Sequence, residues 1–149
     1  MIEDLYIYDG KRLDYGELPA DRQAMVKSEK KRIAKEVYEI VKDKKVKQVI
    51  DNEQPIEICF TKKGVKHFCN DALLLLSGKY FSEDEMKLIN YILEKAEYLE
   101  SYHSLKHLRS DGRDLWFTYK DKEGRGVYFK VSWSRYTKQY ELYSVVEKI

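Results

Sequence analysis

The spacing of apolar residues predicts helices in the first half of the chain and strands in the last third. The expected core face of a first long helix, over residues 19–41, consists of Val26, Ile33, Val37, Ile40 and Val41. Pro19 suits the first turn of this helix, because its fixed φ is helical and its missing N–H is not needed there. Ahead of the helix, residues 5–8 should form a short extended segment that ends at an Asp9-Gly10 turn.

A strand and two further helices should follow the long helix. Residues 56–60 alternate between apolar and other side chains, which is typical of a strand with one buried face. Thr61 is placed to cap the next helix. The apolar stripe of that helix comprises Val65, Phe68, Cys69, Ala72, Leu73 and Leu76. Residues 82–85, Ser-Glu-Asp-Glu, form a capping box that starts a third helix, and Phe81 and Met86 hold the two positions of a hydrophobic staple.

The last third of the chain shows the period of two that strands require. Residues 115–119 and 127–133 both alternate and are separated by turn residues, so we expect a hairpin there and another strand over 140–146. N-terminal helices followed by an antiparallel β-sheet meander place the protein in the α+β class. We expect a single domain over residues 1–149, with residues 1–18 as an N-terminal arm.

Length and composition agree with one globular domain. The chain has 149 residues, of which 43% are hydrophobic, and no apolar run approaches the roughly 20 residues of a membrane-spanning helix. The first residues lack a basic segment followed by an apolar stretch, so we expect a cytoplasmic protein without a membrane partner. Cys59 and Cys69 form no Cys-x-x-Cys pair, and we interpret both as buried thiols in a reducing compartment.

Positive charge is concentrated in one part of the chain. The net charge is only +2, but residues 25–50 hold nine basic and four acidic side chains, and the first 24 residues are net acidic. The outer face of the first long helix carries most of these lysines. Such a face is either simply solvated or follows the phosphates of a nucleic acid, and in the second case the protein could bind RNA without cleaving it.

The segment 103–113 carries a dense group of candidate chemical residues, namely His103, Lys106, His107, Arg109 and Arg113. Its two histidines have a helical spacing that zinc could use, but nearby Cys or Glu partners are missing and the neighbouring cations would repel a metal ion. An anion fits better. Metal-free RNA cleavage needs a base for the 2′-hydroxyl, an acid for the leaving oxygen and cations for the phosphorane. The alternative is a solvated loop between a helix and a hairpin.

A second candidate group surrounds the second predicted helix. His67 lies near the start of this helix, close to Lys62 and Lys66, and helix starts attract anions because unpaired N–H groups point outward there. The alternative is a surface histidine on a basic helix face. Lys79 and Tyr80 offer a further phosphate contact and a ring on which a base can stack.

Three segments of the chain resemble a large polyvalent protein-associated domain of phages and conjugative elements. Residues 56–66, Ile-Glu-Ile-Cys-Phe-Thr-Lys-Lys-Gly-Val-Lys, resemble its strand and Phe-Thr-x-Lys-Gly-Ile-Lys opening. Residues 92–99 are similar to its helix ending in Ala-x-Tyr, and residues 141–147 to its closing Leu-Tyr-Ser-Ile strand. The three segments follow the family's order within residues 56–149.

This resemblance implies a barnase/EndoU/colicin/RelE-like nuclease fold, with two N-terminal helices before a four-stranded antiparallel sheet, and action on RNA. The family often has Gln-Pro-His-Lys-His after this helix, whereas residues 71–80 contain no histidine here. Only the Lys79-Tyr80 pair is left to correspond to part of that stretch. Because a fold does not fix a function, the nuclease-like fold can persist without the chemistry.

These features together predict a metal-independent endoribonuclease or toxin-like effector of a phage or mobile element. The predicted catalytic residues are His67, Lys79, His103, His107 and Arg113. The predicted substrate-binding residues are Lys62, Lys66, Tyr80, Lys106 and Arg109. We expect RNA as the partner, and neither a metal nor a cofactor. The alternative is an inactive nuclease-like fold that binds a host or immunity protein, for example as an inhibitor of a host defence system.

Overall fold

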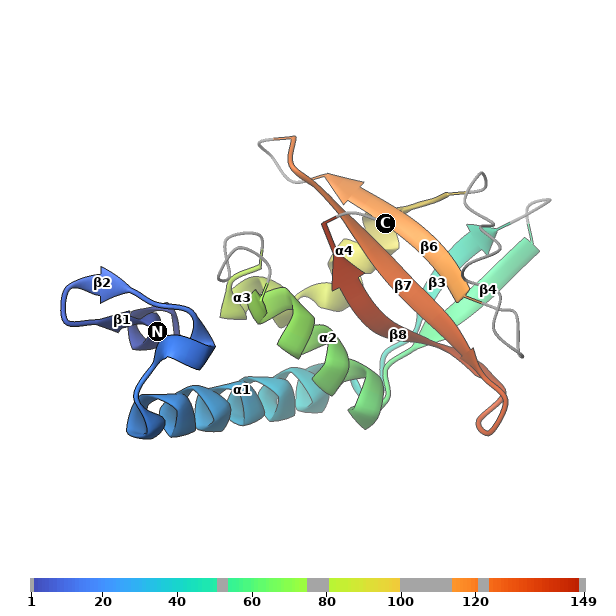
Figure 1. Ribbon diagram of the computed structural model, residues 1–149. Helices are drawn as coiled ribbons and strands as arrows, with labels where there is room; N and C mark the ends of the chain where they lie inside the picture. Colours follow the sequence, from blue (N-terminus) through green and yellow to red (C-terminus); the bar gives the residue numbers. More distant parts are fainter. Residues whose placement is uncertain (1, 51–53, 75–80, 100–113, 121–123, 148–149) are drawn as a thin grey trace.

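The protein has an α+β architecture in which helices cover one face of a six-stranded sheet (Figure 1). The computed structural model describes residues 2–50, 54–74, 81–99, 114–120 and 124–147. The strand order of the sheet is β3-β4-β8-β7-β6-β5, and a separate two-stranded sheet pairs β1 with β2. The predicted α+β class is therefore confirmed.

The first residues fold into short elements that sit on the long helix. A 3-10 helix (Ile2–Tyr6) leads into β1 (Ile7–Tyr8) and β2 (Lys11–Arg12), and a second 3-10 turn covers Tyr15–Glu17. The predicted turn is confirmed, because Asp9 and Gly10 have φ values of 53° and 74°. The extended segment predicted for residues 5–8 is wrong in its first half, which belongs to the 3-10 helix. Arg22 secures this region by donating to the carbonyl oxygen of Ile7 at 3.1 Å.

Helix α1 (Ala20–Val41) is the predicted long helix, and its apolar stripe faces the core. Val26, Ile33, Val37 and Val41 have no exposed surface. Ile40, which the sequence placed in the same stripe, is instead 42% exposed, because it lies at the edge of the face that packs. A hairpin that the sequence analysis did not predict in full follows, with β3 (Val46–Ile50) antiparallel to β4 (Gln54–Cys59).

The next helices begin where the sequence predicts, but the last one is interrupted. Helix α2 (Lys62–Leu74) follows Thr61. The capping box at Ser82 is confirmed, since its hydroxyl accepts from the N–H of Glu85 at 3.2 Å. The single helix expected from Ser82 is wrong: α3 (Glu83–Met86) ends before Leu88, and α4 (Ile89–Lys95) starts after it. No glycine or proline signals this break.

The sheet consists of the predicted meander and one parallel addition. Strand β6 (Asp114–Lys120) pairs with β7 (Gly126–Ser134), and β7 pairs with β8 (Gln139–Val146), all antiparallel. The short β5 (Glu97–Tyr98) pairs with the outer edge of β6. Strand β8 also pairs with β4 in the parallel direction, through Ile58 with Tyr140 and Cys59 with Glu141. The sheet is therefore mixed, with one parallel pairing among antiparallel ones.

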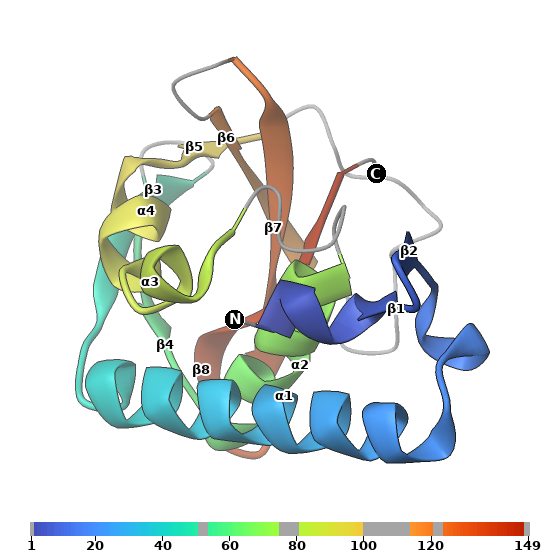
Figure 2. The ribbon, with the colours of Figure 1, turned by 90° about the vertical axis from the view of Figure 1, so that its left-hand side faces the viewer.

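The core lies between the helices and one face of the sheet. Phe68 of α2, Phe81 and Phe129 of β7 form a cluster of three rings whose centroids are 5.9–6.4 Å apart. Figure 2 shows α1 along the bottom of the molecule, with α2 between it and the sheet. Cys69 is buried as predicted, whereas Cys59 is only half-buried, because it lies at the end of β4 on the side away from the core.

Candidate functional site

Helix α2 covers the edge of strand β8, and the contact between them forms the candidate site. Strand β4 ends at Cys59, so no strand in the described part of the chain pairs with the remainder of β8 on that side. A sheet edge with free backbone groups needs a cover, and here a helix supplies it. We call this contact the α2–β8 seam. It joins Thr61, Gly64, His67 and Asp71 to residues 141–144.

The first turn of α2 fixes one end of the seam. The N–H of Gly64 donates to the hydroxyl oxygen of Thr61 at 3.0 Å, which confirms the predicted cap. Burial raises the pKa of the Glu141 carboxyl, although a hydrogen bond from Thr61 and the charge of Lys63 counteract part of this effect. Gly64 lies so close to the carbonyl oxygen of Leu142 that a β-carbon would overlap it. The helix is therefore seated directly on the backbone of β8.

His67 is the chemical centre of the seam. Its Nδ1 lies 3.0 Å from Oδ2 of Asp71 and 3.0 Å from the carbonyl oxygen of Tyr143. Both neighbours are acceptors, so the network assigns the proton of the neutral imidazole to Nδ1 and the lone pair to Nε2. The imidazole also stacks on the Tyr143 ring, with a centroid distance of 4.1 Å and an interplanar angle of 22°.

The outer edge of the His67 ring is accessible. Its side chain is 42% exposed, and no residue in the described ranges hydrogen-bonds Nε2. Histidine is the side chain that most readily takes up and releases a proton near neutral pH. The seam thus holds a partly exposed imidazole whose orientation is fixed from two sides.

A hydroxyl from β8 holds the carboxylate that orients His67. Ser144 Oγ donates to the same oxygen of Asp71, Oδ2, at 2.6 Å. Ser144 is buried, and the Asp71 side chain is 22% exposed. A histidine that donates one ring N–H to a carboxylate keeps a single tautomer and orientation. Asp71 and Ser144 therefore act on His67 as positioning residues.

A β-bulge explains why Tyr143 reaches the helix. Lys130 pairs with Ser144 and Val131 pairs with Leu142, which leaves Tyr143 as an extra residue in β8. Bulges redirect a side chain and are common beside active sites. The Lys130 ammonium lies 5.5 Å from the centre of the Tyr143 ring and 3.4 Å from Asp114 Oδ2. The Tyr143 ring therefore contacts the Lys130 ammonium group, which is itself paired with Asp114.

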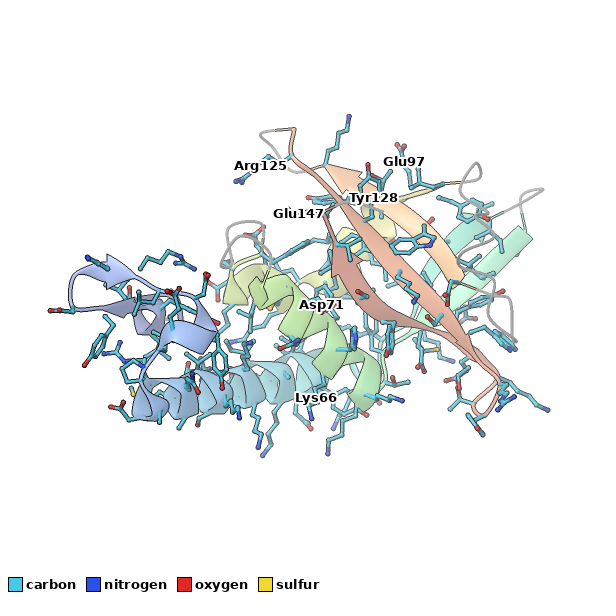
Figure 3. All side chains as sticks on the ribbon, in the orientation of Figure 1. Lys66, Asp71, Glu97, Arg125, Tyr128 and Glu147 are labelled. Atoms are coloured by element: carbon cyan, nitrogen blue, oxygen red, sulfur yellow. The ribbon has the colours of Figure 1, made fainter. Side chains whose placement is uncertain are left out.

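The predicted site residues are only partly brought together. His67 faces β8, whereas Lys62 and Lys66 line a groove between α2 and α1. Figure 3 shows the separation through Lys66, which lies toward α1, and Asp71, which lies toward the sheet. The other predicted residues lie outside the described part of the chain. They are Lys79, Tyr80, His103, Lys106, His107, Arg109 and Arg113.

Sequence reasoning missed three residues of the seam: Asp71, Tyr143 and Ser144. Asp71 had a local signal, because it follows His67 by four residues and so lies on the same helix face. Tyr143 and Ser144 belong to the closing segment 141–147, but their contact with α2 depends on the pairing of β8 with β4. That long-range pairing has no signature in the local pattern.

The comparisons with other proteins leave the site to be judged by its own geometry. No protein-family model, no curated protein and no solved structure matches the chain.

Within the described ranges, no group of three or more His, Cys, Asp or Glu side chains is placed to hold a metal ion. None of the helices described here is long and apolar enough to cross a membrane.

Proposed function

We propose that the protein is a metal-independent endoribonuclease in which His67 is the general base. The observation that carries this proposal is the fixed imidazole: Nδ1 points at Asp71 and the Tyr143 carbonyl, the side chain is 42% exposed, and no described residue hydrogen-bonds Nε2. A base must lie within hydrogen-bond reach of the proton that it removes, so it needs an accessible atom in a fixed orientation. His67 meets both requirements.

The chemistry is an internal transfer at phosphorus. Nε2 of His67 takes the proton of a ribose 2′-hydroxyl, and the 2′-oxygen then bonds to the adjacent phosphorus. The bond from phosphorus to the 5′-oxygen breaks, and this oxygen leaves with a proton from a second donor. The products are a 2′,3′-cyclic phosphate and a free 5′-hydroxyl. The donor is proposed to be His103 or His107, and the cations Lys79 and Arg113 are proposed to stabilise the charge of the phosphorane.

One further feature supports this proposal. The seam joins residues 56–66 to residues 141–147, which are two of the three segments that resemble the phage and mobile-element domain. We therefore also propose membership of that nuclease-like family, and a role as a cytoplasmic effector of a mobile element.

The test is cleavage of a labelled single-stranded RNA in EDTA by the purified protein and its variants. His67→Ala should slow cleavage by about 10²–10⁴-fold, the usual contribution of a general base. Asp71→Asn should also slow cleavage, because the side-chain amide introduced there can present an N–H instead of an acceptor to Nδ1. The matched control is Asp84→Asn, which changes an exposed carboxylate on α3 and should leave the rate unchanged.

Two results would refute the proposal. The first is intact RNA after prolonged incubation with the folded protein, which would favour the alternative of an inactive nuclease-like fold that binds a protein. The second is a His67→Ala variant with full activity. Should this variant fold poorly, His67→Gln keeps most of the side-chain volume and permits the same comparison.

A further inference from the structure

A basic groove runs between α1 and α2, on the side of α2 that faces away from the seam. The groove has a volume of about 470 Å³. The lysines that line it are Lys30, Lys31 and Lys35 of α1 and Lys62 and Lys66 of α2. Tyr38 is half-buried and adds an aromatic wall. Its size is within the range of small-ligand sites.

The residues that the structure describes leave the lysines of this groove without carboxylate partners. None of its five lysines forms an ion pair with a residue in the described ranges. The acidic residue in the lining is Glu39, whose carboxylate already accepts from Lys42 at 2.9 Å. Arg32, on a neighbouring face of α1, is different: it contacts Glu29, Glu36 and Glu83 at 2.7–2.8 Å. The groove thus gathers five lysines that no carboxylate of the described residues pairs, whereas the charge of Arg32 is fully paired.

The lysines are arranged in two rows along antiparallel helices. At one end, the Lys30 ammonium donates to Asn70 Oδ1 at 3.3 Å. At the other end, Glu39 lies within the electrostatic influence of Lys62. Lys31–Lys35 and Lys62–Lys66 are both pairs four residues apart, so charges repeat about every 6 Å along each helix. Two such rows suit an extended chain of anions better than a single anion.

Lys30 forms a less solvated end of the groove. Burial lowers the pKa of its ammonium group, and the group also lies 5.7 Å from the centre of the Tyr15 ring. An anion bound beside Lys30 would compensate, by its opposite charge, for the hydration that this ammonium group has lost. The groove thus combines a partly desolvated cation at one end with solvated cations along its length.

We propose that this groove binds the sugar-phosphate backbone of single-stranded RNA. Lysine is a common point-charge ligand of phosphate, and an aromatic ring beside the cations, here Tyr38, supplies a surface on which a base stacks. The inference rests on the proposed function and extends it. His67 and Lys66 are neighbours on α2, so an RNA strand held in the groove has to cross only one helix to reach the imidazole.

The test separates binding from cleavage by using His67→Ala protein and a fluorescent ten-nucleotide RNA. Binding is followed by anisotropy over a series of salt concentrations. Each lost phosphate contact should reduce the slope of log K against log salt by about 0.7 for a single strand, so Lys31→Ala/Lys35→Ala should reduce it by about 1.4. The control is Lys11→Ala/Lys120→Ala, which removes the same charge from exposed positions outside the groove.

The outcomes distinguish this inference from the proposed function. Equal slopes for the two double variants would overturn the inference, because the effect would then follow net charge alone. Competition by polyglutamate as strong as competition by RNA would also overturn it, in favour of an acidic protein. A reduced slope for the groove variant, together with an inactive wild-type protein, would support the inference while the proposed nuclease activity failed.

Discussion

The replacement Gly64→Ala tests whether α2 is seated on β8 as tightly as the structure shows. The added β-carbon would overlap the carbonyl oxygen of Leu142, which belongs to the backbone and cannot swing aside as a side chain can. The same atom would also approach the Thr61 hydroxyl oxygen to 3.0 Å. The helix must therefore move away from β8, or the strand must bend.

Two opposing effects determine the size of the change in stability. Alanine in place of glycine favours the helix by up to about 1 kcal/mol. Overpacking of a well-packed contact typically costs about 1–3 kcal/mol, and a backbone neighbour places Gly64→Ala toward the upper end. The net loss should be about 1–2 kcal/mol. For a chain of 149 residues this corresponds to a fall in Tm of roughly 2–8 °C.

The assay is thermal unfolding by circular dichroism, with urea unfolding as a second measure of the free energy. Gly126→Ala is the matched control, since a β-carbon there meets no atom within 4 Å. The Gly64→Ala protein should also cleave RNA more slowly than the wild type, because a shift of α2 separates His67 from Tyr143. A Gly64→Ala protein that is more stable than the wild type by about 1 kcal/mol would refute the close contact, leaving only helix propensity.

Three further predictions concern the core and its titratable groups. Phe129→Ala should destabilise the protein by about 3–5 kcal/mol in urea unfolding, because it empties the centre of the ring cluster; a loss below 1 kcal/mol would contradict that packing. Hydrogen bonds from Arg32 hold the pKa of Glu83 at about 2, below its ordinary 4.5. The ionised carboxylate therefore contributes its full stabilisation at pH values above 4.5. Its contribution is lost as the pH falls toward 2, and Glu83→Gln should flatten the loss of stability between pH 5 and pH 2. Burial raises the pKa of the Cys69 thiol to about 12, so a thiol reagent at pH 8 should label Cys59 first, as peptide mass spectrometry can check.

Elements with strong local signals could be predicted from the sequence. The apolar stripe of α1, the capping box at Ser82 and the alternation in β6 and β7 each lie within one short segment. Strand β3 gave no such signal, because a polar residue interrupts its inward face and an apolar residue lies on its outward face. Gln48 points inward and satisfies its amide on the carbonyl oxygens of Leu93 and Ala96, whereas Val49 is 52% exposed.

The candidate site shows the same division between local and long-range information. His67 could be selected from its position near a helix start, and Asp71 from its helical spacing to His67. The roles of Tyr143 and Ser144 depend on a bulge in β8 and on the parallel pairing of β8 with β4. Likewise, the basic charge of residues 25–50 was visible in the sequence, but only the packing of α1 on α2 assembles part of it into a groove.

The most direct measurement compares two oligonucleotides that differ in one oxygen atom. One is RNA throughout, and the other has a 2′-deoxyribose at the cleaved position; both are incubated with wild-type and His67→Ala protein in EDTA. We expect cleavage of the first by the wild type alone, with a 2′,3′-cyclic phosphate product, and no cleavage of the second at that position. Cleavage of the deoxy substrate, or equal cleavage by both proteins, would contradict the role of His67 as the base that activates the 2′-hydroxyl.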